Sequence, residues 1–205
     1  MIKRGENMII TNNMIKEKFT NILNKNTKLS REVRDGKLIK IKNGLYETDP
    51  NIPGYYLAGS IYGPSYLSFD FALSYYGLIP EKVFNYTSAT YNKKKSKMYQ
   101  NHFGTFLYRD VPKEAYPFEI SLIEVKNYAY QIANKEKALC DKLYTLMPLH
   151  NYNELEIMLF EDLRIDEEEF DKLDSEIVNK LANYYHSTNV SLLARYMKKN
   201  KKSSL

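Results

Sequence analysis

Cysteine, glycine and tryptophan are scarce in this 205-residue chain, with one, eight and none of them respectively. The single cysteine, Cys140, cannot form an internal disulfide, which favours a reducing compartment. No apolar run approaches the roughly 18 residues of a membrane span, and no signal peptide opens the chain. We therefore expect a cytoplasmic protein, in which 43% hydrophobic residues suffice to form a core.

Residues that usually carry enzyme chemistry are also few and scattered. His102, His150 and His186 stand alone in the sequence, without the spacing of metal ligands. Glycine is too sparse for a phosphate-binding loop, and a Gly-x-Ser-x-Gly nucleophile elbow is missing. Glu136 and Asp141 are five residues apart on one predicted helix, so they do not face the same side as a pair. We expect no enzyme, no cofactor and no metal; the alternative, a nuclease, has only scattered carboxylates in its favour.

Charge is distributed unevenly along the chain, whose net charge is +5. Residues 1–47 hold 11 lysines and arginines against 5 acidic residues, and residues 85–113 hold 6 against 1. Residues 151–187 hold 11 acidic residues against 3 basic ones, and residues 188–205 hold 5 basic residues and no acidic one. Two basic blocks and a basic tail indicate an anionic polymer as partner. The alternative is a set of charged surfaces that contact only solvent.

The start of the chain has the pattern of two helices followed by a basic hairpin. Residues 1–12 show no clear period, and apolar residues at helical spacing then predict a helix over 13–23. Thr27 is the predicted cap of a second helix, over 28–35. Isoleucines that alternate with lysines predict a strand after it, and Asn43-Gly44 predicts a tight hairpin.

This order of elements is that of a winged helix-turn-helix. A helix fits the major groove of DNA and reads base edges, while the hairpin, or wing, contacts the backbone. We therefore predict a DNA interface made of Asn26, Thr27, Lys28, Arg31, Arg34, Lys37, Lys40, Lys42 and Asn43. One alternative is an ordinary amphipathic helix with a structural hairpin. Another is an incomplete unit, whose first helix is missing, very short or supplied by a second subunit.

Beyond a turn-rich connector at 49–54, the pattern becomes that of an α+β domain. The stretch 64–80 predicts a buried helix with Ser68 as its cap and Gly77 at its end. Strands are predicted at 83–91, 104–111, 118–125 and 128–133, and helices at 55–62 and 135–147, the latter capped by Asn134. A charged loop between two of these strands is a second candidate contact for nucleic acid, through Lys93, Lys94, Lys95 and Lys97.

From residue 151 onward, apolar residues recur at helical spacing. Asp166 and Glu169 match a capping box at the start of one short helix. The basic end of the chain is expected to be disordered. The predicted fold class is α+β, divided into a winged helix-turn-helix at 1–48, an α+β core at 54–147, a helical extension at 151–197 and a basic tail at 198–205.

Several segments match one protein family, in the family's order. They are Lys37-Leu-Ile-Lys-Ile-Lys-Asn-Gly-Leu-Tyr46, Pro64-Ser-Tyr-Leu-Ser68, Ala72-Leu-Ser-Tyr-Tyr-Gly-Leu78, Thr87-Ser88, Phe103-Gly-Thr-Phe106 and Ala133-Asn-Lys-Glu-Lys-Ala-Leu-Cys-Asp141. Through them the chain resembles, over residues 27–146, the AbiEi family of antitoxins from bacterial type IV toxin–antitoxin (abortive infection) systems. The central stretch and the Glu-Lys-Ala-Leu-x-Asp segment are the most specific of the matches.

The resemblance implies a winged helix-turn-helix that binds double-stranded DNA at inverted repeats in its own promoter. It also implies a second domain that takes part in repression and opposes a nucleotidyltransferase toxin of the AbiEii type, without a stable complex. We therefore expect an antitoxin and transcriptional autorepressor that acts in phage defence, with no membrane partner. The alternative is an antitoxin that acts through RNA or protein contacts and carries a vestigial winged helix.

Overall fold

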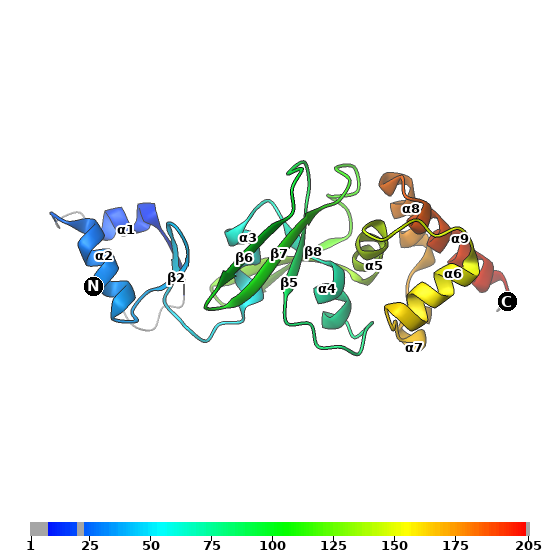
Figure 1. Ribbon diagram of the computed structural model, residues 1–205, viewed down its shortest axis with the longest axis horizontal. Helices are drawn as coiled ribbons and strands as arrows, with labels where there is room; N and C mark the ends of the chain where they lie inside the picture. Colours follow the sequence, from blue (N-terminus) through cyan, green and yellow to red (C-terminus); the bar gives the residue numbers. More distant parts are fainter. Residues whose placement is uncertain (1–7, 20–22, 204–205) are drawn as a thin grey trace.

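A computed structural model describes residues 8–19 and 23–203 of the chain. The molecule is elongated, with the N-terminal unit at one end, a six-stranded sheet in the middle and a group of helices at the other end (Figure 1). Helices and strands occur together rather than in a purely helical or purely β architecture, so the predicted α+β class is confirmed.

The N-terminal unit consists of two helices and a three-stranded antiparallel sheet. Its elements are β1 (Ile9–Thr11), α1 (Asn12–Lys18), α2 (Lys25–Arg34), β2 (Ile39–Lys42) and β3 (Leu45–Glu47). The strand order is β1-β3-β2, so the hairpin pairs with a strand from the first segment of the chain. Three residues are too few to show a period, which is why β1 was not predicted; residues 1–7 lie outside the described residues. A small core of Ile10, Ile15, Phe19, Leu38 and Tyr46 joins helices and sheet.

Helix α2 begins a turn earlier than the sequence predicted. Asn24, not Thr27, is its N-cap, because the Asn24 side-chain oxygen accepts a hydrogen bond from the Thr27 N–H (3.2 Å). Asparagine ranks above threonine as an N-cap, which agrees with this outcome. Gly36, with φ of +68°, follows the end of the helix. Leu23, expected on the apolar side of the first helix, is fully exposed, and Ile22 lies outside the described residues.

The predicted hairpin is confirmed. Strands β2 and β3 are antiparallel, and Lys42 pairs with Leu45 across the two-residue turn Asn43-Gly44. Gly44 has φ of +79°, and a Cβ atom at this position would lie 2.7 Å from the Asn12 side chain. Glycine is therefore required both by the turn and by its contact with the start of α1.

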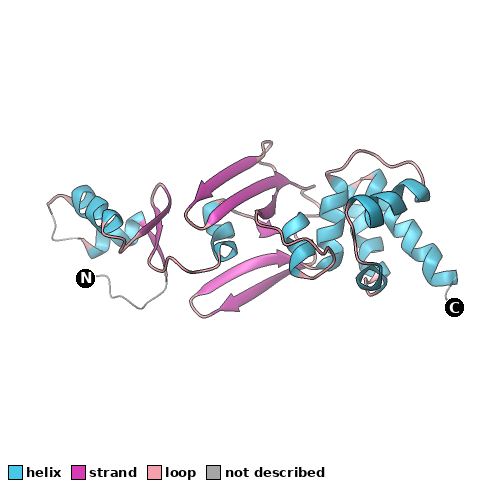
Figure 2. Ribbon diagram, turned by 60° about the horizontal axis from the view of Figure 1, so that its bottom comes forward, coloured by secondary structure: helices cyan, strands magenta, loops and turns pink. Residues whose placement is uncertain are grey.

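The central region is a mixed sheet in the order β6-β7-β5-β4-β9-β8 (Figure 2). Its strands are β4 (Tyr66–Leu67), β5 (Tyr86–Thr90), β6 (Lys97–Asn101), β7 (Gly104–Asp110), β8 (Ile120–Val125) and β9 (Tyr128–Ala133). Strand β5 is parallel to β7 and β4 is parallel to β9, while the other neighbours are antiparallel. One face contacts η1 (Gly54–Leu57) and α3 (Ala58–Ile61), and the other contacts α4 (Phe69–Tyr75) and α5 (Lys135–Tyr144).

Four predicted strands are confirmed, and two strands were missed. The strands β5, β7, β8 and β9 fall within the predicted ranges, and Asn134 caps α5 as expected. Strand β4 was hidden inside the stretch predicted as a helix. Strand β6 was missed because its residues are mostly exposed and show no apolar alternation. It includes Lys97, which the sequence analysis assigned to the charged loop.

The central helix α4 starts after Ser68 as predicted, but its cap is built differently. Ser68 is the N-cap residue, yet its hydroxyl does not accept a helix N–H. The Ser68 hydroxyl donates instead to Asp141 (2.6 Å), and the Thr87 hydroxyl accepts the Phe71 N–H (3.1 Å). Gly77, with φ of +74°, follows the end of the helix as predicted.

A fully buried carboxylate joins the sheet to the helices. Besides the bond from the serine, Asp141 accepts hydrogen bonds from the hydroxyls of Tyr66 (3.0 Å) and Tyr185. Lys137, one turn earlier on α5, lies 3.5 Å from Asp141 and donates to the Ala115 carbonyl (2.6 Å). Buried charges require such partners because no water solvates them. The Glu-Lys-Ala-Leu-x-Asp segment therefore holds the fold together.

The C-terminal region is helical, as predicted. Its elements are α6 (Tyr152–Glu156), a π-helical turn η2 (Ile157–Asp162), α7 (Glu167–Asp171), α8 (Ser175–Tyr185) and α9 (Thr188–Ser203). The predicted capping box is only half formed. The Asp166 side chain accepts the Glu169 N–H (3.0 Å), but the Asp166 N–H donates to the Leu78 carbonyl (2.8 Å) instead of to the Glu169 carboxylate. The prediction of a disordered tail is wrong for residues 198–203, which extend α9, because lysine is a good helix former; residues 204–205 lie outside the described residues. In the described ranges, no helix combines the length and the apolar character needed to cross a membrane.

Candidate nucleic-acid interface

Helix α2 turns its apolar side toward the small N-terminal core and its polar side toward solvent. Leu29 and Val33 pack against that core, as the sequence predicted. Four predicted DNA contacts on this helix are exposed: Asn26, Thr27, Arg31 and Arg34. The Arg34 side chain is 76% exposed, although its Nε lies 3.7 Å from Asp35. The two arginines are therefore displayed on the surface and not turned inward.

A buried carboxylate engages two other predicted contacts. Glu32 on α2 is only 7% exposed. Lys28 Nζ lies 2.7 Å from one of its carboxylate oxygens, and Lys37 Nζ lies 3.9 Å from the other. A phosphate that contacts either lysine has to compete with Glu32. The spacing of Lys28 and Glu32, four residues apart on a helix, is the signal that reveals this ion pair in the sequence.

The predicted hairpin contacts point in different directions. Lys40 and Asn43 are exposed. Lys42 is only half-exposed, and its ammonium is already bound within the protein, because it donates to the backbone carbonyl of Ile61 in the central region. A bulge between Lys40 and Lys42 breaks the regular alternation of the strand, which explains why the prediction placed both lysines together. Lys42 thus anchors the hairpin.

A second bond fastens the hairpin to the central sheet. The Asn101 side-chain amide on β6 donates to the Ile41 carbonyl on β2 (3.1 Å). An open groove of about 560 Å³ runs between the two strands, lined by residues 40–43 and 99–101. No acidic residue lines this groove. The role of Asn101 was missed, because nothing local in the sequence places β6 beside β2.

The second predicted contact, the charged loop, is partly engaged within the protein. The backbone N–H groups of Lys93 and Lys94 both donate to one carboxylate oxygen of Asp110 (2.7 Å each). The Lys93 ammonium donates to the Gly63 carbonyl (3.1 Å). The exposed lysines of this segment are Lys94, Lys95 and Lys97.

Two of the isolated histidines come together in space. His150 and His186 line one open groove of about 450 Å³, together with Arg195. Within the described residues, no group of three or more His, Cys, Asp or Glu side chains is arranged to hold a metal ion. The third histidine, His102, contacts the connector at residues 49–54, with its Nε2 3.1 Å from the Pro50 carbonyl oxygen.

The remaining residues considered for chemistry have structural partners. Glu136 accepts the Asp174 N–H (2.9 Å), which ties α5 to the start of α8. Cys140 is fully buried, and burial raises the pKa of its thiol. A buried thiol with a raised pKa is a poor nucleophile.

No model of a protein family matches the chain, and no curated protein matches it. The surface just described and the resemblance in sequence are therefore the basis for a functional proposal.

Proposed function

We propose that this protein is a DNA-binding autorepressor and antitoxin of a type IV toxin–antitoxin system, with its N-terminal unit acting as a winged helix-turn-helix. One observation carries the DNA-binding part. Arg31 and Arg34 are exposed on α2, in a unit whose hairpin also exposes Lys40 and Asn43. The antitoxin part rests on the resemblance of residues 27–146 to the AbiEi family.

In this proposal α2 is the recognition helix. Its first turn carries Asn26 and Thr27, whose side chains donate and accept hydrogen bonds at base edges in the major groove. Arg31 and Arg34, further along the helix, provide the positive charge that a duplex attracts. Lys40 on the hairpin contacts the backbone beside the groove.

The distribution of partners predicts which charges matter most. Lys28 and Lys37 are paired with Glu32, and Lys42 is bound to a backbone carbonyl. The arginines of α2 therefore contribute more to binding than the neighbouring lysines do. Each phosphate contact that is lost should make the slope of log affinity against log salt shallower by about 0.9.

A mobility-shift titration on the protein's own promoter fragment tests the proposal. We expect the double variant Arg31→Ala/Arg34→Ala to bind at least about tenfold more weakly, with a salt slope shallower by about 2. Arg195→Ala is the matched control, since Arg195 is also an exposed helical arginine but lies in the C-terminal region. Equal affinities of the double variant and the unaltered protein would remove α2 from the interface.

A second candidate function is an antitoxin that acts through RNA or protein contacts, with a vestigial winged helix. The internal bonding of Lys28, Lys37 and Lys42 favours it, because it leaves the N-terminal unit with fewer free cations. Co-expression with a nucleotidyltransferase toxin of the AbiEii type separates the two. If the double arginine variant loses DNA binding but still restores growth, the antitoxin activity does not depend on the operator.

A further inference from the structure

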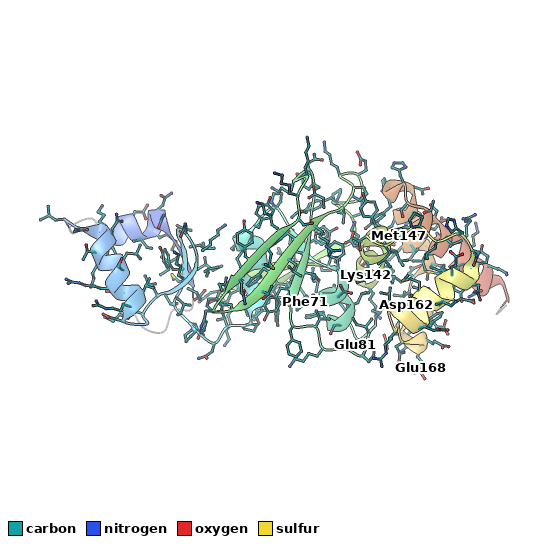
Figure 3. All side chains as sticks on the ribbon, in the orientation of Figure 1. Phe71, Glu81, Lys142, Met147, Asp162 and Glu168 are labelled. Carbon is teal, nitrogen blue, oxygen red and sulfur yellow. The ribbon has the colours of Figure 1, made fainter. Side chains whose placement is uncertain are left out.

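A small cavity lies on the face of the central sheet that carries α4 and α5. Its volume is about 120 Å³. Strands β5 and β7 contribute Thr87, Leu107 and Arg109 to its lining, and the two helices contribute Asp70 and Lys142. Figure 3 shows Lys142 on α5, beside the sheet. The cavity shares no residue with α2 or the hairpin, so nothing in the proposed DNA interface accounts for it.

Two cations and one carboxylate line the cavity. Lys142, whose side chain is 18% exposed, has its ammonium 2.6 Å from one carboxylate oxygen of Asp70. An ammonium has three N–H donors, so at least one remains for another acceptor. Arg109 is exposed, and its side chain forms no hydrogen bond or ion pair with any residue in the described part of the chain. Its guanidinium thus presents a full set of donors at the cavity.

The backbone at the cavity is strained. Phe69, which also lines it, has φ of +55°, a left-handed conformation that is costly for a bulky side chain. Residues in such conformations gather at ligand-binding and switch regions, where the surrounding structure holds them. Here the strained residue directly precedes Asp70 and so sets where its carboxylate meets Lys142.

We propose that this cavity binds one phosphate group, held between the Arg109 guanidinium and the Lys142 ammonium. The cavity volume is too small for a nucleoside, so only the phosphate group enters. The rest of a phosphate ester would remain outside the cavity, beyond the exposed Arg109 side chain. The two cations exceed the single carboxylate by one charge, which suits a monoanion. Planar guanidinium groups match the geometry of phosphate oxygens.

Asp70 gives the site a basis for selecting phosphate over sulfate. Its second carboxylate oxygen has no hydrogen-bond partner among the described residues. A phosphate that retains a proton donates it to this oxygen, whereas sulfate is fully ionised near neutral pH and would meet the carboxylate as a like charge. Asp70 therefore serves in this proposed anion site as the acceptor of a hydrogen bond from protonated phosphate.

Calorimetric titration of the full-length protein with inorganic phosphate tests the proposal. We expect saturable binding at one site, weakened at least about tenfold in Arg109→Gln. Arg195→Gln, an exposed arginine outside the cavity, should bind phosphate as the unaltered protein does. The absence of saturable binding, or equal affinity in Arg109→Gln, would overturn the proposal.

Two further arms sharpen the test. Sulfate should bind more weakly than phosphate to the unaltered protein, and Asp70→Asn should reduce that preference; an equal preference in both proteins would contradict the role of Asp70. Competition by adenosine monophosphate would identify a phosphate ester as the source, whereas binding of inorganic phosphate alone would identify the free ion. Both of these results retain the phosphate site. Because none of the substituted residues lies in α2 or the hairpin, loss of DNA binding leaves this test unaffected.

Discussion

The N-terminal unit and the central region differ in where they place basic side chains. Among the described residues, the separate core of the N-terminal unit comprises five buried apolar residues, and the arginines of α2 are exposed around it. The central region has a large core and, within it, buries Lys137 and Asp141 completely. The exposed arginines of the first region can change with little effect on folding, whereas the buried pair in the second region is part of the fold. A ligand-binding surface can therefore change in sequence more readily in the N-terminal unit than in the central region.

The largest effect that separates the two regions should come from Asp141→Ala. This variant leaves the Lys137 ammonium buried without its carboxylate and removes the acceptor of three hydroxyls. We expect a loss of about 3–5 kcal/mol in the free energy of unfolding, measured with urea. Glu168→Ala, an exposed carboxylate on α7 that Figure 3 labels, should change it by less than about 0.5 kcal/mol. A similar small change in both variants would refute a structural role for the buried pair.

Alkaline pH should weaken the central region next. Burial, together with the charge of Asp141, raises the pKa of Tyr66 and of Tyr185 well above 10.0, and burial raises the pKa of Tyr116 to about 12. Above pH 10 the unfolded chain loses these protons while the folded chain keeps them, so stability falls as pH rises. Each fully buried tyrosine contributes about 1.4 kcal/mol per pH unit.

Urea midpoints measured between about pH 8 and pH 11.5 check this expectation, and the Tyr185→Phe variant should show a shallower fall because one titrating group is gone. Midpoints that stay constant across that range would show that the buried hydroxyls ionise equally in both states.

A smaller effect is expected at the start of α2. Asn24→Ala removes the side chain that accepts the Thr27 N–H and should lower the free energy of unfolding by about 1 kcal/mol. Thr27→Ala removes a side chain that does not cap the helix, so its effect should be clearly smaller. Circular dichroism during urea unfolding measures both. The opposite ranking would restore Thr27 as the cap.

The smallest effect should come from Glu32→Gln. This change frees Lys28 and Lys37 from their carboxylate, so both become available to phosphates. We expect DNA affinity to rise about threefold, and the salt slope to steepen, in the same mobility-shift titration. An unchanged slope would show that neither lysine reaches the duplex.

Local sequence predicted those features that depend on neighbouring residues. Asn43-Gly44 closes the hairpin because both residues tolerate the turn, and the Asp166 side chain caps its helix by accepting the Glu169 N–H three residues on. The order of two helices and a hairpin followed from periodicity together with local turn and capping signals, and four of the six central strands followed from periodicity. Whether the unit binds DNA is a property of its surface and stays a prediction.

Features that depend on distant residues were not predictable. Ser68 occupies the N-cap position of α4, but its hydroxyl donates to Asp141, 73 residues further along the chain. Lys42 has the sequence context of a free wing lysine, but folding brings it to the Ile61 carbonyl. The cavity between Arg109 and Lys142 is made by elements that meet only in the folded sheet.

The solitary cysteine has a practical consequence. Cys140 is fully enclosed, and its raised pKa keeps the sulfur protonated. A maleimide dye should therefore not label the natural chain, and it should label a Lys40→Cys variant at the introduced cysteine alone. Fluorophores attached there would report on the hairpin in the unaltered background, without first deleting any native thiol.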